Sequence, residues 1–265
     1  MRPPRARSGA AAAPAPQAER LQKVLSRAGI ASRRTVEEWI RAGRLTINGA
    51  PASLGARIGP RDAVRLDGRT VHTAAPAQAP VFLCHRSPGE PLRSPVGGTA
   101  PEAPRAALLE RLPRRAGRRF ISIAPLPRID GGLELVTADG AIAARLQRRA
   151  HALESEFSVR VRGELAAEQL AGIRSGQLDR GAPLAVALCE AGGGEGSNRW
   201  YTLRVRGASG KSVRQLFERQ GALVSRVLRT RLGELSLERT LARGQFRELS
   251  GPELAALLGA AAADH

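Results

Sequence analysis

The chain has 265 residues, of which 42% are hydrophobic and 25% are charged. This is enough for one large or two modest domains with hydrophobic cores, so the composition excludes a wholly disordered chain. Lysine and arginine total 42 residues against 24 aspartates and glutamates, which gives a formal net charge of +18. Such an excess favours a polyanionic partner, and arginine, which supplies nearly all of it, binds phosphate oxygens in pairs. Codon bias in a GC-rich genome explains arginine in place of lysine, but not the excess itself.

Other classes of protein are excluded by the distribution of special residues. Cys84 and Cys189 lie far apart and there are only four histidines, so we expect neither a disulfide framework nor a metal site. The longest candidate for a membrane span, residues 254–263, is too short. Residues 1–18 combine arginines with alanine and proline and contain no acid, which is typical of a disordered basic tail. We therefore expect a soluble cytoplasmic protein with no membrane partner.

The first folded unit is expected over residues 19–78. Apolar residues recur at helical spacing from Leu21 to Ala28, and Gly29 ends this helix. Ser32 can cap a second helix, which Gly43 ends. Short strands are predicted at 45–48, 62–66 and 70–71, with an Asn-Gly turn and an Asp-Gly turn at positions 48–49 and 67–68.

A larger α+β domain is expected over residues 79–259, followed by a short tail at 260–265. Six prolines make residues 87–118 a loop-rich insert, in which only 106–112 reads as helical. Beyond the insert, strands are predicted at 120–124, 133–137, 157–161, 200–205 and 224–228, and helices at 141–149, 212–219 and 250–258. Asp139 is expected to cap the first of these helices, and Ser250 with Glu253 the last. The glycines at 192–194 are interpreted as a loop.

The first unit carries the motifs R-L-x-K-x-L, A-G-x-A-S-R-R and G-x-L-x-I-N-G in order. In this it resembles the S4 RNA-binding domain. Basic side chains gather at its helix ends and in the linking turn, where helix N-terminal amides help to hold phosphates. The candidate RNA-binding residues are Lys23, Arg27, Arg33, Arg34 and Arg44. For any one of them the alternative is a solvated surface side chain.

The whole segment 19–258 resembles the bacterial ribosomal-RNA pseudouridine synthases of the RsuA/RluB group. The resemblance rests on PLPRID, GLELVTADGAIAARL, ESEFSVRVRGE, NRWYTLRV, SGKSVRQLFERQGALVSRVLRTRLGELSL and RGQFRELSGPEL. It implies an S4-like domain before a larger domain whose mixed, mainly antiparallel sheet is flanked by helices. It also implies ribosomal RNA as the partner and a monomeric protein.

The resemblance further implies a catalytic set of four residues. Asp130 is the matching nucleophile, Arg128 the arginine that accompanies it, Arg214 the arginine that pairs with it, and Phe157 the ring that stacks on the uracil. Moving ribose from a ring nitrogen to a ring carbon of one uracil needs a carboxylate nucleophile and a flipped base. Neither a metal nor a redox cofactor is required, and we expect none.

Two departures from that family leave alternatives open. The loop after Asp130 is three residues shorter, so Asp130, Gly131 and Gly132 can also be interpreted as a tight turn between strands. Phe157 stands where the group has tyrosine, and an apolar residue on an alternating strand can equally belong to the core. The sequence thus favours a pseudouridine synthase and leaves a second possibility, an RNA-binding or ribosome-assembly protein that has the same fold without turnover.

Overall fold

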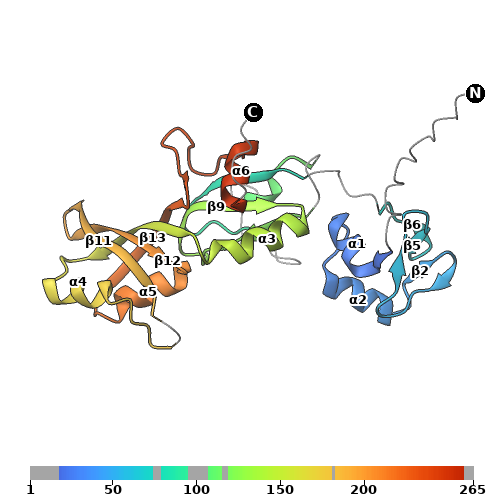
Figure 1. The fold of residues 1–265 in the computed structure, drawn as a ribbon, viewed down its shortest axis with the longest axis horizontal. Helices are drawn as coiled ribbons and strands as arrows, with labels where there is room; N and C mark the ends of the chain where they lie inside the picture. The colour runs from blue at the N-terminus through green and yellow to red at the C-terminus, as the bar shows by residue number, and fades with distance from the viewer. Residues whose placement is uncertain (1–17, 74–78, 95–106, 115–118, 181–182, 260–265) are drawn as a thin grey trace, which may run out of the picture. The chain divides into compact units, whose positions relative to one another are not determined.

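The computed structural model describes residues 18–73, 79–94, 107–114, 119–180 and 183–259. The predicted tails therefore lie outside the described residues, apart from residue 18, as do parts of the predicted insert at 95–106 and 115–118. The chain divides into two compact units between Ala75 and Pro76. Both units combine helices with strands, as predicted (Figure 1). No helix in the described part of the chain is long and apolar enough to cross a membrane.

The first unit consists of two helices packed on a small sheet. Its elements are β1 (Glu19–Arg20), α1 (Leu21–Arg27), α2 (Arg33–Arg41), β2 (Leu45–Ile47), β3 (Ala50–Pro51), β4 (Arg57–Ile58), β5 (Val64–Leu66) and β6 (Arg69–Thr70). Strands β3, β2, β5 and β6 form one sheet in that order, and β1 pairs with β4. The predicted cap is present, because the Ser32 hydroxyl accepts a hydrogen bond from the amide of Thr35 at 2.9 Å. Leu25 and Val36, which have no exposed surface, join the two helices in the core.

The predicted turns follow from backbone conformations that few residues adopt. Asn48 and Gly49 have φ angles of 52° and 89°, and Asp67 and Gly68 have φ angles of 49° and 76°. Two successive positive φ values match the twist of a two-residue hairpin, and this explains why Asn-Gly and Asp-Gly occur at these positions.

The second unit is built on one mixed sheet. Its strands are β7 (Val81–Arg86), β8 (Ile121–Ile123), β9 (Gly131–Thr137), β10 (Glu154–Arg162), β11 (Ala185–Glu195), β12 (Asn198–Arg206), β13 (Leu223–Leu232), β14 (Leu235–Ser236) and β15 (Phe246–Glu248). The order is β11-β12-β10-β13-β9-β7-β15, with β14 beside β13 and β8 beside β9. The described strand pairs of this sheet are antiparallel except β13 with β9, which is parallel.

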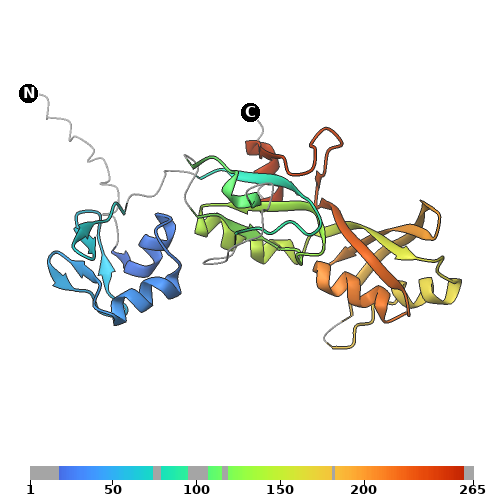
Figure 2. The same cartoon turned by 180° about the vertical axis from the view of Figure 1, so that it is seen from behind.

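Helices cover the two halves of this sheet separately (Figures 1 and 2). They are α3 (Gly140–Ala150), α4 (Ala167–Arg174), α5 (Gly210–Glu218) and α6 (Gly251–Leu258). Helices α4 and α5 pack on β10 to β13 around a core that includes Phe157, Val159 and Val161, the predicted alternating residues. Helices α3 and α6 share a second core with β7 and β9. Asp139 caps α3 as predicted, since its carboxylate accepts hydrogen bonds from two amides of the first turn.

Two local predictions were wrong, and one strand was missed. The glycines at 192–194 belong to strand β11, where the chain passes so close to β12 that a side chain at Gly194 would meet the Asn198 carbonyl oxygen. The helix expected at 106–112 is only the 3-10 turn η1 (Leu108–Glu110). Strand β7, which lies between β9 and β15, was not predicted, because its apolar run shows no alternation of apolar and polar residues.

Candidate active site

The two halves of the large sheet meet where β9 pairs with β13. Only two residue pairs join these strands, Leu228 with Gly131 and Arg229 with Gly132. A Cβ atom at Gly131 would lie 2.6 Å from the Arg86 carbonyl oxygen, and one at Gly132 would lie 2.2 Å from that of Arg229. Both positions therefore require glycine. The two glycines begin β9, so they do not form the plain turn between strands that the sequence left open.

Asp130 immediately precedes this meeting point and its side chain has no exposed surface. Its amide donates to the Pro127 carbonyl at 3.1 Å. The carboxylate Oδ1 accepts a hydrogen bond from Nη2 of Arg214 at 2.5 Å. A Cβ atom at Gly210, the first residue of α5, would lie 3.3 Å from Oδ2, so the start of that helix closely borders the carboxylate. The short loop thus presents the carboxylate toward α5.

Arg214 is held by the packing of α5. Val213 and Leu216 are buried on the helix face that packs on the sheet, and Ser209 caps the helix. The Arg214 Nη1 atom donates to the Val224 carbonyl of β13 at 2.8 Å, and the side chain is 17% exposed. One nitrogen of the guanidinium therefore binds the sheet and another binds Asp130. The planar guanidinium holds these two donors in a fixed geometry, which a lysine ammonium does not.

Burial and the Arg214 ion pair act on Asp130 in opposite directions. Burial raises the pKa of the Asp130 carboxyl above its ordinary value, because the charged form loses water. The hydrogen bond and charge of Arg214 oppose this rise, and the nearby charge of Arg86 does so more weakly. The site thus holds a poorly hydrated carboxylate against one guanidinium, which suits nucleophilic attack on a carbon atom.

Neither of the other two predicted catalytic residues makes a hydrogen bond or ion pair with the Asp130 carboxylate, which binds Arg214. Arg128 is exposed, and its Nε atom donates to the Gly89 carbonyl at 3.1 Å. Phe157 has no exposed surface and belongs to the core cluster that includes Leu126 and Val213, which corresponds to the core alternative. Stacking of Phe157 on a uracil stays a prediction, and it requires displacement of the side chains that cover the ring.

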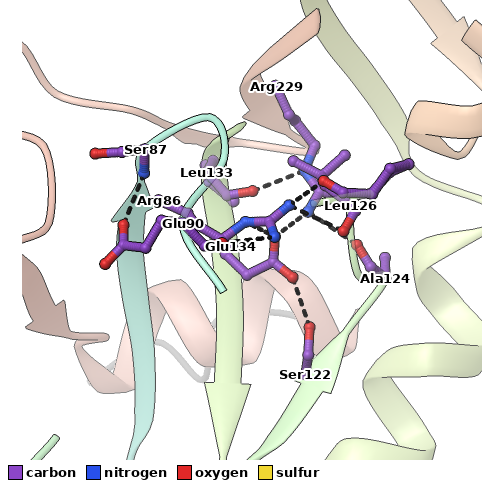
Figure 3. Close-up of polar contacts among 10 residues, drawn as sticks. Arg86, Ser87, Glu90, Ser122, Ala124, Leu126, Leu133, Glu134 and Arg229 are labelled. Atoms are coloured by element: carbon purple, nitrogen blue, oxygen red, sulfur yellow. Dashed lines mark hydrogen bonds and ion pairs between the residues drawn. The ribbon is translucent and has the colours of Figure 1, made fainter. Parts of the chain in front are cut away.

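Sequence reasoning missed a group of buried charges beside the loop. These are Arg86 of β7, Glu134 of β9 and Arg229 of β13, which lie close together (Figure 3). Each residue is at most 1% exposed. Two sequence signals could have found them. Glu134 is the single acid within the apolar run of β9, and Arg86 ends β7 one residue after its apolar run at 81–84. Charged residues in such runs are almost never buried unless they are paired.

The five predicted RNA-binding residues of the first unit differ in what they contact. Three of them make ion pairs: Lys23 and Arg27 with Glu19 at 2.6 and 2.5 Å, and Arg44 with Asp67 at 2.5 Å. Arg33 and Arg34 open helix α2 and are exposed, and their side chains make no hydrogen bond or ion pair with another described residue. These two arginines are therefore the most available of the five to an anion.

Comparison with known proteins gives matches in both units. The S4 domain family matches residues 19–71. Proteins called ribosomal large subunit pseudouridine synthase B are similar over most of the chain. The one from Pseudomonas aeruginosa is 37% identical over 90% of this chain and 61% of its own length, and the one from Haemophilus influenzae 37% over 89% and 66%. The Salmonella typhi protein is 36% identical over 87% of this chain and 79% of its own length.

A solved structure has a fold similar to that of this chain. A crystal structure of a pseudouridylate synthase aligns with 90% of this chain and 99% of its own, with a TM-score of 0.57 and 19% identity. The α+β architecture with an S4 domain, as predicted, is thereby confirmed. The chain spans less than two thirds of the P. aeruginosa and H. influenzae proteins, but more than two thirds of the S. typhi protein. From the identity to that relative, the chain belongs to the ribosomal large subunit pseudouridine synthase B family.

Proposed function

We propose that this protein is a pseudouridine synthase that isomerises a uridine of ribosomal RNA in the cytoplasm, with Asp130 as the nucleophile. The observation that carries the proposal is the buried carboxylate of Asp130, 2.5 Å from the Arg214 guanidinium at the meeting point of the two sheet halves. The names of the relatives favour RNA of the large ribosomal subunit as the substrate.

The reaction is balanced without an oxidant or reductant. The bond between C1′ of the ribose and N1 of the uracil breaks, a bond between C1′ and C5 forms, C5 loses a proton and N1 gains one. Asp130 provides the nucleophilic carboxylate. Arg214 orients it and favours its ionised form. The target nucleotide has to leave its stack to reach the buried Asp130 carboxylate, and unstacking costs a few kcal/mol that RNA binding has to offset.

A second candidate function is RNA binding without turnover. The observation that favours it is the short segment after Asp130, which leads directly into β9 at Gly131. Against it stands the orientation of the carboxylate toward Arg214, which a purely structural turn does not need.

Tritium release distinguishes the two functions. Transcripts of large-subunit and small-subunit ribosomal RNA carrying tritium at C5 of uracil are incubated with the protein, because the reaction replaces that hydrogen. We expect release from the large-subunit transcript and none from the small-subunit transcript. Tight binding with no release from any transcript would establish the second function instead.

The arginines at the start of α2 give a separate prediction for RNA binding. The first turn of α2 contains no acid, so Arg33 and Arg34 place positive charge at the positive end of the helix dipole. Replacing both by glutamine is expected to stabilise the first unit by a few tenths to about 1 kcal/mol. If both contact phosphates, the slope of log affinity against log salt falls by about 2. Calorimetry and filter binding at several salt concentrations measure the two effects.

The matched control for this pair lies in the second unit. Arg239 and Arg243 are also exposed and make no ion pair with another described residue. Replacing both by glutamine removes the same charge, and we expect a smaller loss of affinity and a smaller change in slope. Equal effects from the two pairs would show that α2 has no special part in binding.

A further inference from the structure

The buried charges Arg86, Glu134 and Arg229 require an explanation, because moving three charged groups out of water is costly. They come from three neighbouring strands, β7, β9 and β13, and contact the segment 124–127 that precedes Asp130 in the chain (Figure 3). Their contacts with that segment are through its backbone.

Arg86 binds two consecutive carbonyls of the segment. Its Nη2 atom donates to the carbonyl of Leu126 at 2.9 Å and to that of Pro127 at 2.7 Å. The Pro127 carbonyl also accepts the amide of Asp130 at 3.1 Å. One guanidinium nitrogen is thus connected to the backbone of Asp130 through a single carbonyl oxygen.

Arg229 fixes the beginning of the same segment. Its Nη2 atom donates to the Ala124 carbonyl at 2.9 Å, and its Nε atom donates to the Leu133 carbonyl at 2.9 Å. Ala124 has a φ angle of 54°, in the left-handed region that a residue other than glycine adopts only when its surroundings require it. The hydrogen bond to its carbonyl provides such a constraint.

Glu134 compensates both cations. Its Oε2 atom lies 3.6 Å from Nε of Arg86 and 3.9 Å from Nη2 of Arg229, and its Oε1 atom accepts a hydrogen bond from the Ser122 hydroxyl at 2.8 Å. These ion pairs are longer than hydrogen bonds. The Nη2 groups of Arg86 and Arg229 therefore make their hydrogen bonds with the carbonyls of residues 124, 126 and 127, and not with Glu134.

We propose that Arg86, Glu134 and Arg229 form a buried clamp that positions Asp130 by fixing the carbonyls of residues 124, 126 and 127. Because the Pro127 carbonyl also accepts the Asp130 amide, the clamp sets where the segment presents the carboxylate. Arg86 and Arg229 are positioning residues. The catalytic consequence rests on the proposed synthase function, whereas the ordering of the loop does not.

Hydrogen exchange tests the clamp without reference to activity. Amide exchange is followed by mass spectrometry in peptides that cover residues 124–130, in the wild type, Arg86→Met and Arg86→Lys. We expect exchange at least tenfold faster in Arg86→Met, and an intermediate rate in Arg86→Lys, which keeps the charge and one donor. If Arg86→Met does not fold, Arg86→Lys alone decides the result. Unchanged exchange in the folded variant would overturn the proposal.

A matched control separates positioning from general loss of stability. Leu146 of α3 is buried in the core shared with β7 and β9 but makes no hydrogen bond to the loop. Leu146→Ala weakens that core, and we expect it to leave exchange at 124–130 unchanged under conditions where the protein stays folded. Equal acceleration in Leu146→Ala and Arg86→Met would mean that the clamp acts only on stability, and would overturn the proposal.

Kinetics on RNA provide the second arm. We expect Arg86→Met to lower kcat at least tenfold with little change in KM, since a misplaced nucleophile affects the reaction and not RNA binding. The acid limb of its pH profile should move to higher pH, because Arg86 and Arg214 are the two cations that lower the pKa of Asp130. An unchanged kcat, or an unchanged acid limb, would contradict positioning. Absence of tritium release by the wild type would refute the synthase function, and the exchange result would still decide the clamp.

Discussion

Replacing Asp130 by asparagine is expected to reduce tritium release from ribosomal RNA on the order of 10⁴-fold or more, a size typical for loss of an essential nucleophile. Asparagine keeps the shape of the side chain and an oxygen that can accept the Arg214 hydrogen bond, but it has no carboxylate to attack carbon. The measurement is the single-turnover rate on the transcript that the wild type modifies. Release at the wild-type rate would remove Asp130 from the mechanism.

The same variant is not expected to lose stability at neutral pH. Burial raises the pKa of Asp130 in the folded chain, so the folded state binds more protons than the unfolded state between the two pKa values. Stability from this group is therefore present at low pH and is lost as the pH rises through the raised value. At neutral pH the ionised carboxyl opposes folding, and Asp130→Asn should melt at or above the wild-type temperature. A much lower melting temperature would make its inactivity uninformative.

Replacing Glu134 by leucine is expected to lower the free energy of unfolding of the second unit by about 3–5 kcal/mol. The change leaves Arg86 and Arg229 buried with no acid between them, and their side chains are 2% and 1% exposed. Removing one partner of a buried ionic group leaves an uncompensated charge, which costs more than the pair itself contributed. Urea denaturation in a Trp39→Phe background, which leaves Trp200 as the single tryptophan, reports on this unit by fluorescence.

An exposed ion pair in the same unit is the control. Glu238 lies 2.8 Å from Arg247, with the two side chains 50% and 27% exposed. Water and salt screen such a pair, so Glu238→Gln should change the free energy of unfolding by less than about 1 kcal/mol. Similar values for Glu134→Leu and Glu238→Gln would show that the buried charges do not need one another.

Elements with local signals were predictable from the sequence. Ser32 and Ser250 mark helix starts by their own hydrogen bonds, and positive φ angles explain the Asn-Gly and Asp-Gly turns. The alternation around Val159 correctly gave the buried face of β10. These features depend on residues a few positions apart, so a short stretch of sequence contains the whole cause.

The site itself depended on contacts between distant parts of the chain. Asp130 and Arg214 were brought together by family resemblance, since no periodicity relates positions 84 residues apart. Arg86 was missed because its strand was missed, and because the sequence alone does not distinguish a buried arginine from the many exposed ones. Phe157 had two interpretations that the sequence could not separate, because an aromatic residue on an alternating strand fits both a core and a stacking position.

Strands β9 and β13 pair through only two residues each, and this close contact means that some positions of the site tolerate substitution and others do not. Gly131 and Gly132 take no part in any chemical step, yet any side chain there collides with the backbone of a neighbouring strand. Arg128 precedes Gly131 by a few residues and is exposed, so a different side chain at this position meets no such collision. Substitution therefore has more freedom at exposed positions such as Arg128 than at Gly131 and Gly132, which have no side chain.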